Sequence, residues 1–258
     1  MVNSIWNRLE ELSLNSWPAL ETRLYGGWLL RFADGYTKRS NCVVPLYSEE
    51  QSTETGELER RIAYCEQIYE GKGQDSIYKV FSFTPQIDLA LEQNGYEKVD
   101  PVWLKTMELS RLPQFADEEL RFELFEAYDE RWLEQYSAMS ALGETSKLPA
   151  AKLLHAMPDR KCFLTLYEEG EPAACGVAVL EDGWVALYDI ITDTRFRQRG
   201  LAERLVRKLL QWGREQGAEF GYLMVLQHNV PANRLYDKIG FEQQYDYWYR
   251  VKKRTFSL

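Results

Sequence analysis

The sequence has little of the material used for metal or redox chemistry. Its 258 residues contain four cysteines and two histidines. The cysteines are scattered and form no C-x-x-C pair: Cys42, Cys65, Cys162 and Cys175. Neither a zinc site nor a redox dithiol is therefore expected, and each cysteine reads as a small buried residue. His155 has apolar neighbours and His228 stands alone in a predicted turn, so we predict no metal site.

The sequence also lacks a basic excess and any long apolar run. Lys and Arg number 31 against 40 Asp and Glu, which gives a net charge of −9. A nucleic-acid partner is not expected, because such proteins usually carry a basic surface. No stretch approaches the ~18 apolar residues of a membrane helix, and the start has no basic flank before an apolar run. We expect a soluble, cytoplasmic protein without membrane contact, as a monomer or weak dimer.

What is present indicates two units of mixed α/β type. A proline after a strand-like run divides the chain into residues 1–112 and 113–258. Periodicity in the first part predicts strands at 28–32, 41–46, 77–83 and 102–109, with helices at 57–70 and 85–94. In the second part it predicts strands at 121–125, 162–167, 173–180, 184–192, 220–226 and 245–252. Helical patterns there cover 120–142, 147–156, 201–216 and 230–239.

An internal repeat relates the two parts. A shift of 145 residues superposes Val80 on Val225, Leu91 on Tyr236, Gly95 on Gly240 and Trp103 on Trp248. A shift of 144 places Gly56 on Gly200. The repeat indicates two copies of one αβ unit.

A basic loop joins the predicted strand 184–192 to the long helix after it. The first turn of a helix has unpaired N–H groups and the positive end of the dipole, which together favour an anion. Gly200 would let a ligand approach the backbone, and three arginines add positive charge: Arg195, Arg197 and Arg199. A phosphate-bearing ligand is one interpretation. The other is a solvated basic helix start with no ligand.

Two motifs here resemble those of a known family. Arg197-Gln198-Arg199-Gly200-Leu201-Ala202 matches the pattern R/Q-x-x-G-x-G/A, and residues 229–241 match N-x-x-A-x-x-L-Y-x-x-x-G-F. Both belong to the GNAT acetyltransferase superfamily, which the chain resembles over about residues 120–250. The N-terminal half resembles a degenerate unit of the same kind, as in tandem two-unit acyltransferases. The resemblance implies an α/β (α+β) fold in which each unit is a twisted mixed, mostly antiparallel sheet flanked by helices.

The resemblance also implies roles for the matched residues, with acetyl-CoA as co-substrate bound in a splay between two central strands. Tyr236 would lie near the thioester sulfur as a general acid. The backbone around Gly200 would hold the pyrophosphate, and the strand end and Asn229 would hold the pantetheine arm. The cofactor-binding residues would be Ile191, Thr192, Asp193, Arg197, Gln198, Arg199, Gly200, Leu201, Ala202, Glu203 and Asn229. Asn229 could instead be only a helix N-cap, and Tyr236 only a core aromatic.

The general base is less well marked. Asp189 interrupts an apolar strand just before the cofactor residues. With period-2 alternation it shares a face with Leu187 and Ile191, and covering that face would raise the pKa of its carboxyl. Asp189 could also be a structural hydrogen-bonding group. Glu181, Glu144 and ordered water remain alternatives.

The first unit lacks the basic loop. The positions aligned with residues 197–200 read Thr53-Glu54-Thr55-Gly56, and Leu91 stands where the second copy has Tyr236. Acidic side chains there would repel a pyrophosphate. We expect this unit not to bind CoA, but to complete the sheet and wall the acceptor pocket.

The sequence thus predicts an N-acetyltransferase that moves an acetyl group from acetyl-CoA to an amine by direct attack. No cysteine stands near the motifs to serve as nucleophile. The acceptor would be a small-molecule amine or an amine of a peptide or protein, covered by residues 128–157. One alternative is a non-catalytic acyl-CoA-binding or regulatory module. A transferase with an aminoacyl donor is another, although the net charge disfavours tRNA.

Overall fold

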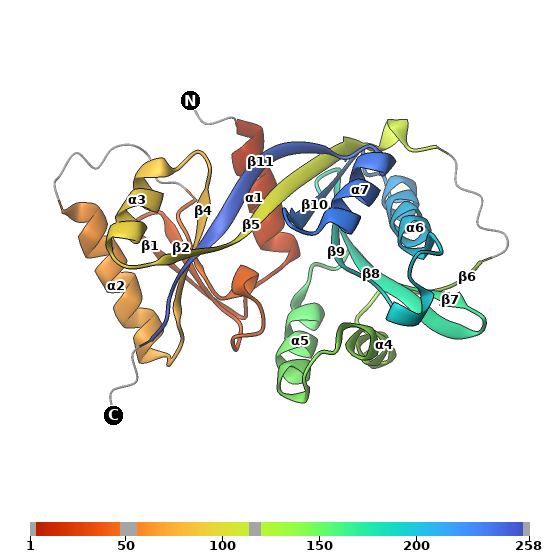
Figure 1. Cartoon of the computed structure of the whole chain (residues 1–258), viewed down its shortest axis with the longest axis horizontal. Coiled ribbons are helices and arrows are strands. Elements are labelled where there is room, and N and C mark those ends of the chain that lie inside the picture. Colours follow the sequence, from red (N-terminus) through yellow and green to blue (C-terminus); the bar gives the residue numbers. More distant parts are fainter. Residues whose placement is uncertain (1–3, 47–55, 114–119, 255–258) are drawn as a thin grey trace. The chain divides into compact units, whose positions relative to one another are not determined.

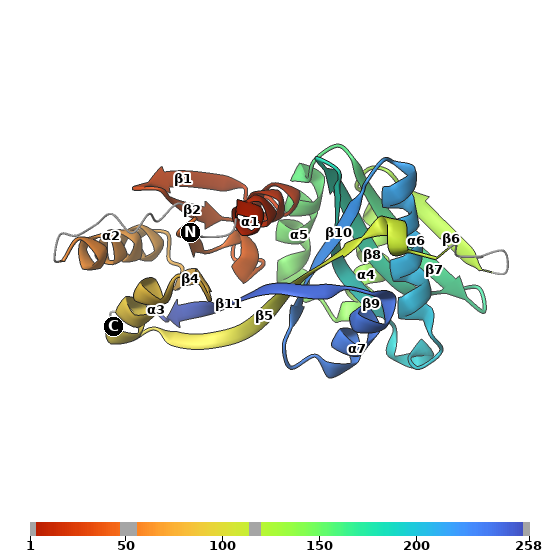
Figure 2. The same cartoon turned by 90° about the horizontal axis from the view of Figure 1, so that it is seen from above.

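The structure is a computed structural model of the chain, and it describes residues 4–46, 56–113 and 120–254. The chain forms two compact units (Figures 1 and 2). Unit 1 comprises Met1–Glu11, Ala19–Trp103 and Tyr245–Leu258, and unit 2 comprises Leu12–Pro18 and Leu104–Gln244. In the part of the chain that is described, no helix is both long and apolar enough to span a membrane.

In the described residues, unit 1 is a mixed sheet with three helices, of which α2 and α3 belong to the internal repeat. Its strand order is β1-β2-β3-β4-β11-β5, in which β3 and β4 are parallel and β4 and β11 antiparallel. The strands are β1 (Glu21–Tyr25), β2 (Trp28–Phe32), β3 (Val43–Val44), β4 (Ser76–Phe81), β5 (Glu97–Glu108) and β11 (Glu242–Lys252). The helices are α1 (Ser4–Ser16), α2 (Glu57–Gly71) and α3 (Pro85–Gln93). Of these elements, α1, β5 and β11 contribute residues to both units.

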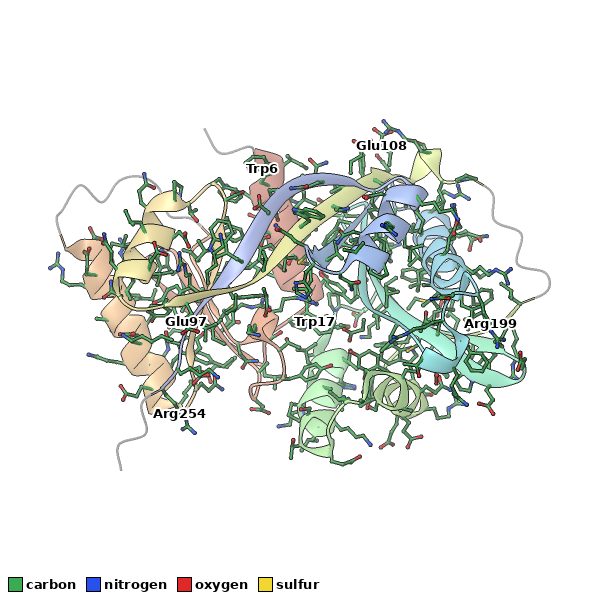
Figure 3. All side chains as sticks on the ribbon, viewed as in Figure 1. Trp6, Trp17, Glu97, Glu108, Arg199 and Arg254 are labelled. Carbon is green, nitrogen blue, oxygen red and sulfur yellow. The ribbon has the colours of Figure 1, made fainter. Side chains whose placement is uncertain are left out.

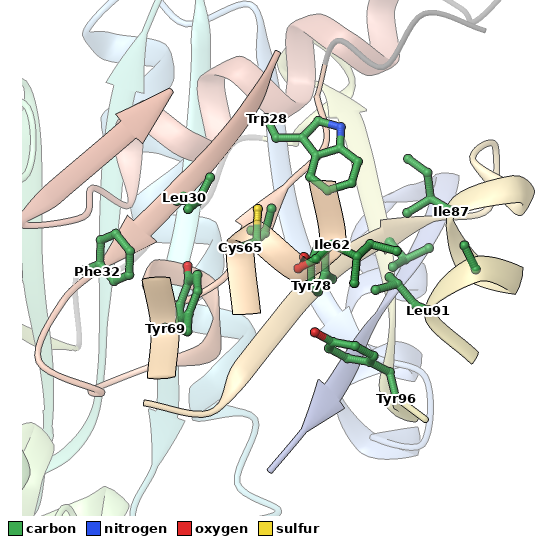
Figure 4. Close-up of a cluster of buried hydrophobic side chains, with 13 residues drawn as sticks. Trp28, Leu30, Phe32, Ile62, Cys65, Tyr69, Tyr78, Ile87, Leu91 and Tyr96 are labelled. Carbon is green, nitrogen blue, oxygen red and sulfur yellow. Dashed lines mark hydrogen bonds between the residues drawn. The ribbon is translucent and has the colours of Figure 1, made fainter. Parts of the chain in front are cut away.

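The core of unit 1 lies between this sheet and the helices α2 and α3 (Figure 4). Alternate strand residues such as Trp28, Leu30 and Tyr78 are at most 1% exposed and meet helix residues such as Tyr69 and Leu91. This is the arrangement expected when a period-2 strand face meets a period-3.6 helix face.

Unit 2 continues the pattern with a longer meander. Its strand order is β11-β5-β10-β9-β8-β7-β6, antiparallel from β6 to β9 and parallel between β9 and β10. The further strands are β6 (Arg121–Phe125), β7 (Lys161–Glu168), β8 (Glu171–Glu181), β9 (Trp184–Thr192) and β10 (Phe220–Leu226). The helices are α4 (Glu130–Ser140), α5 (Glu144–Ala156), α6 (Leu201–Glu215) and α7 (Val230–Ile239). The predicted mixed, mostly antiparallel fold is confirmed.

Helices α4 and α6 cover opposite faces of the unit 2 sheet. Gly176 on β8 lies under α6, because a Cβ there would come within 3.1 Å of Leu209. Leu164 is paired with Gly176 and so shares its face, which leaves the neighbouring Phe163 on the other. Trp132 of α4 packs on Phe163, with ring centroids 5.1 Å apart.

The internal repeat is visible in the backbone. The N–H of Tyr96 donates to Leu91 O at 3.0 Å, and 145 residues later the N–H of Phe241 donates to Tyr236 O at 3.0 Å. The glycines before them, Gly95 and Gly240, both have positive φ. Each repeat therefore ends its second helix with the same left-handed cap.

Several elements differ from the sequence prediction. No helix or strand is predicted at α1 or β1, although Trp6, Leu9 and Leu12 have the i, i+3 spacing of an amphipathic helix. The strand predicted at 41–46 is reduced to Val43–Val44. The two units also interleave along the chain, whereas the sequence analysis divides the chain once, after residue 112. The reason is that β11 pairs with β4 from residue 247 to residue 252.

Candidate active site

Strands β9 and β10 diverge part-way along their length. Their parallel pairing runs from Trp184–Phe220 to Leu187–Leu223. Beyond that pair β9 continues to Thr192 beside β8, and β10 continues to Leu226. The strands thus form a V that opens toward their C-terminal ends, as the predicted splay requires.

A β-bulge lies just beyond the vertex of the V. Tyr188 pairs with Val177 and Ile191 pairs with Cys175, so Asp189 and Ile190 together oppose one residue of β8. Asp189 has φ 51°, in the left-handed region. That conformation costs an L-residue about 1–2 kcal/mol, and Asp tolerates it better than most. Strain of this kind is concentrated at functional sites.

The bulge changes which residues share a face. Ile190 lies on the face of Leu187, because its Cδ1 lies over Gly176 beneath α6. Leu187 is paired with Ala178 and Ile191 with Cys175, so these two residues lie on opposite faces, and the prediction that Asp189 shares one face with both is wrong. Asp189 is instead the half-buried first residue of the bulge. Its proximity adds to the raised pKa of the Cys175 thiol, which burial dominates.

The end of β9 offers one backbone amide to the opening of the V. The N–H of Asp193 donates to Ala173 O at 2.9 Å and is therefore engaged with β8. Strand amides alternate in direction, so Ile191 also faces β8 and Thr192 faces away. Thr192 Oγ1 is buried and has no hydrogen-bond partner within the described ranges. Of the three residues predicted at this strand end, Thr192 has unused polar groups.

The backbone of the loop before α6 has a conformation that suits an anion. Gln198 and Gly200 both have positive φ, 65° and 76°, and Gly200 is the N-cap of α6. Such turns make a concave row of N–H groups, which the first-turn amides of Leu201, Ala202 and Glu203 extend. Apart from the chain neighbours of Gly200, no heavy atom of the described residues lies within 4 Å of the position that a Cβ would take there. The backbone is thus open to a ligand, and phosphate groups fit it.

The arginines of this loop are not equivalent. Arg195 is held by Asp193 at 3.0 Å and Glu171 at 2.6 Å. Arg199 (Figure 3) is held by Glu169 at 2.7 Å. Arg197 instead donates from Nε to Thr192 O at 3.4 Å. After the hydrogen bonds from Arg195, its charge helps to lower the pKa of Asp193, but among the described residues Arg197 forms no direct ion pair. Arg197 is therefore the loop arginine with charge to spare for a phosphate.

Glu203 links α6 to α7. Its carboxylate meets Lys238 Nζ at 2.6 Å and Arg207 at 3.1 Å, and the hydrogen bond from Lys238 is the main reason its pKa is lowered. The carboxylate is thus neutralised by two cations, so it does not oppose an anion at the nearby helix start. Only the backbone amide of Glu203 remains for a ligand.

The two motif residues near α7 differ in exposure. Asn229 Oδ1 accepts a hydrogen bond from the N–H of Ala232 at 3.3 Å, so Asn229 is an N-cap, and its exposed amide nitrogen remains available. Tyr236 is 7% exposed and packs edge-on against Phe241. Burial raises the pKa of Tyr236 to about 12. The phenol is therefore a proton donor at neutral pH.

The other predicted candidates for the base, Glu181 and Glu144, lie on β8 and α5. Glu181 pairs with Trp184, seven residues before Ile191, which at about 3.3 Å per residue is roughly 23 Å away along β9. Glu144 is exposed at the start of α5 and paired with Lys147 at 2.5 Å. Neither of these two carboxylates belongs to the β9 bulge that contains Asp189.

One cysteine does lie close to the motifs, contrary to the sequence-based expectation. Cys175 is paired with Ile191 across the β8–β9 ladder. It is 0% exposed, and burial raises the pKa of its thiol well above the ordinary value. A buried protonated thiol is a poor nucleophile, so the environment of Cys175 does not suit it to a covalent intermediate. The described residues contain no group of three or more His, Cys, Asp or Glu suited to a metal ion.

Two features of the site were missed from sequence. The bulge depends on cross-strand register, which local pattern does not reveal. Asn233 is buried and donates from Nδ2 to the carbonyls of Leu226 and Asn229 at 3.0 Å, which fixes the β10–α7 turn. A polar residue on the apolar side of an amphipathic helix is the signal that could have indicated this role.

The fold agrees with comparisons to known proteins. The model of the family described as "Probable histone acetyltransferase Rv0428c C-terminal" matches residues 4–250. The "Uncharacterized N-acetyltransferase YobR" of Bacillus subtilis (strain 168) is 27% identical over 249 residues, covering 95% of this chain and 98% of that protein.

Solved structures share the fold at low sequence identity. The "GCN5-related N-acetyltransferase from Kribbella flavida" has a TM-score of 0.71 at 16% identity, covering 97% of this chain and 96% of that one. The "Tandem GNAT protein from the clavulanic acid biosynthesis pathway" has a TM-score of 0.69 at 11% identity, covering 97% and 89%. The protein is an acyltransferase of the GNAT superfamily. It belongs to the family of the Rv0428c C-terminal domain.

Proposed function

We propose that unit 2 transfers an acetyl group from acetyl-CoA to an amine, by direct attack. The observation that carries the proposal is the convergence of three features on the C-terminal ends of β9 and β10. These are the open V beyond Leu187–Leu223, the bulge at Asp189, and the anion-binding loop before α6. The open surface at Gly200 and the buried, unpartnered Thr192 Oγ1 support the fit of the cofactor.

The loop would hold the pyrophosphate and the strand end the pantetheine arm. Backbone amides from Gln198 to Glu203 supply hydrogen-bond donors without charge, and Arg197 supplies a charge. Thr192 would donate its N–H to the arm, and Asn229 its amide Nδ2. Bound acetyl-CoA supplies an acetyl group activated as a thioester.

Asp189 would act as the base. An amine acceptor is an ammonium ion at neutral pH and must lose a proton before it can attack. The carboxylate of Asp189 lies at the bulge, beside the strand end proposed to hold the arm. Asp189 would take the proton directly or through a water.

Tyr236 would act as the acid. A thiolate leaving group has a pKa near 8.5, so a phenol held neutral can assist its departure by donating a proton at the sulfur. The burial that keeps Tyr236 protonated supports this role. We propose one such site in each chain, in unit 2, with a small-molecule amine or an amine of a peptide or protein as acceptor.

The test is thiol release from acetyl-CoA in the presence of a panel of amines. Wild-type protein should release thiol with at least one amine. Asp189→Asn keeps the shape and the tolerance of positive φ but removes the charge, so it should lower kcat most at low pH, where the acceptor is fully protonated. Saturable CoA binding with no thiol release from any amine would overturn the proposal in favour of a binding module.

A further inference from the structure

The vertex of the V carries a buried cluster of three hydroxyl groups. Tyr188 follows Leu187 on β9, and Tyr222 precedes Leu223 on β10, so the two tyrosines flank the last paired residues. Both tyrosines bond to Ser16, the last residue of α1. Ser16 Oγ lies 2.6 Å from Tyr188 OH and 2.8 Å from Tyr222 OH.

The hydrogen positions in this cluster follow from counting. Ser16 Oγ has one proton, which it donates to Leu12 O at 2.7 Å in the preceding turn. Its two lone pairs are then the acceptors for both tyrosines. The tyrosine oxygens are 3.5 Å from each other, too far for a strong bond between them. One serine oxygen thus joins the two strands.

The cluster is closed to water. Ser16, Tyr188 and Tyr222 are 1%, 4% and 1% exposed. Trp17, which directly follows α1, packs on Tyr188, with ring centroids 5.0 Å apart (Trp17 is labelled in Figure 3). Removal of Ser16 Oγ would take one buried acceptor from both phenols, and bulk water does not replace it.

We propose that Ser16 is a positioning residue that fixes the separation of β9 and β10 where they diverge. The bulge residue Asp189 follows Tyr188 directly, so the tyrosine–serine bond also fixes where the bulge lies relative to β10. We call the hydrogen-bonded group of Ser16, Tyr188 and Tyr222 the clasp. The effect of the clasp on catalysis rests on the proposed acetyl transfer. Its structural consequence does not.

Helix α1 supplies a matched control one turn earlier. Ser13 is also 1% exposed, and among the described residues its Oγ bonds to the thioether of Met224 on β10, at 3.8 Å. Ser13→Ala and Ser16→Ala each remove one buried hydroxyl from the same helix. Only the second removes a link between two strands.

The first readout is steady-state kinetics, measured well below the unfolding temperature of each variant. We expect Ser16→Ala to lower kcat about 10- to 100-fold, because small displacements of reacting groups have effects of that size. The CoA affinity of Ser16→Ala should stay within about threefold of wild type, because the anion-binding loop before α6 is not part of the clasp. The kcat of Ser13→Ala should stay within about twofold of wild type. Tyr188→Phe should lower kcat alone but add nothing in the Ser16→Ala background.

The second readout is amide hydrogen exchange, which does not depend on activity. Ser16→Ala should speed exchange in residues 188–191 and 223–225 beyond any change in global stability, and Ser13→Ala should not. If Ser16→Ala does not fold, Tyr188→Phe takes its place, with the same regions expected to exchange faster. Equal behaviour of the two serine variants in both measurements would overturn the proposal. Faster exchange without any acetyl transfer by wild type would keep the clasp and reject the proposed function.

Discussion

Units 1 and 2 share a backbone plan but differ in their chemistry. Gly56 and Gly200 are both left-handed N-caps, with φ 86° and 76°, of helices that are each 15 residues long. The second helices, α3 and α7, end with the same hydrogen bond to Leu91 O and Tyr236 O. Capping geometry can therefore be kept in a repeat whose side chains have diverged.

The difference lies in what stands beside that backbone. Unit 2 has a nine-residue β9 with a bulge. In unit 1, β3 has two residues, and its Val43 is paired with Tyr78 of β4. Met224 on β10 corresponds to Lys79 on β4, which is 2% exposed and bonded to Glu10 at 2.5 Å. Glu10 also accepts from Tyr245 OH at 2.5 Å. An ionic network thus replaces apolar and hydroxyl groups in unit 1.

The largest contrast is expected at the two capping glycines. Gly200→Trp should abolish CoA binding, since the indole would fill the open surface above the anion-binding loop. Gly56→Trp is the matched control, because Gly56 also has a positive φ and, chain neighbours aside, no described residue lies within 4 Å of the position of a Cβ there. Calorimetry should find wild-type affinity in the control. Unchanged affinity in Gly200→Trp, with circular dichroism preserved, would contradict the assignment of the loop.

Tyr236 and its counterpart Leu91 give the next contrast. Tyr236→Phe makes position 236 apolar, as Leu91 is, and should lower kcat by the 10²–10⁴-fold typical of a lost acid, while CoA affinity stays within about threefold. Because burial raises the pKa of Tyr236 to about 12, its phenol stays protonated at neutral pH and loses its proton only as pH rises toward that value. The pH–rate profiles of wild type and variant should therefore be parallel below about pH 10. Wild-type kcat in the variant would make Tyr236 a packing residue.

The buried ion pair of unit 1 can be broken separately. Lys79→Met leaves the Glu10 carboxylate buried without its cation, and should lower the free energy of unfolding by about 3–5 kcal/mol in urea titrations. Burial lowers the pKa of Lys79, so its amine is already less favourably charged than an exposed one. Lys79→Met with Glu10→Gln should recover part of the loss. A loss below about 1 kcal/mol would show that the pair adds little to unit 1.

The smallest contrast is within the basic loop. Arg197→Ala should weaken CoA binding about tenfold, the value of one charge-assisted hydrogen bond. Arg199→Ala should change it by less than about threefold, because Glu169 already occupies that guanidinium at 2.7 Å. Equal losses, measured at one salt concentration, would mean that the Glu169 pair opens on binding.

Sequence pattern predicted the elements with strong local signals. The α6 helix, the β10 strand and the α7 helix lie within one residue of their predicted bounds, because amphipathic spacing and glycine caps are local. The loop before α6 was placed for the same reason, and its anion-binding role stays a prediction. The bulge at Asp189 and the pairing of β11 with β4 were not predicted, because both depend on partners distant in sequence. The helix α1 was missed although it supplies Ser16.

The central claim is that one unit of this repeated chain keeps the cofactor site. Its most direct test is the stoichiometry of CoA binding to the full chain, measured by calorimetry at a protein concentration well above the dissociation constant. The account predicts one CoA per chain, and none in Gly200→Trp. Two per chain, with one remaining in Gly200→Trp, would show that unit 1 binds CoA as well and would contradict the account.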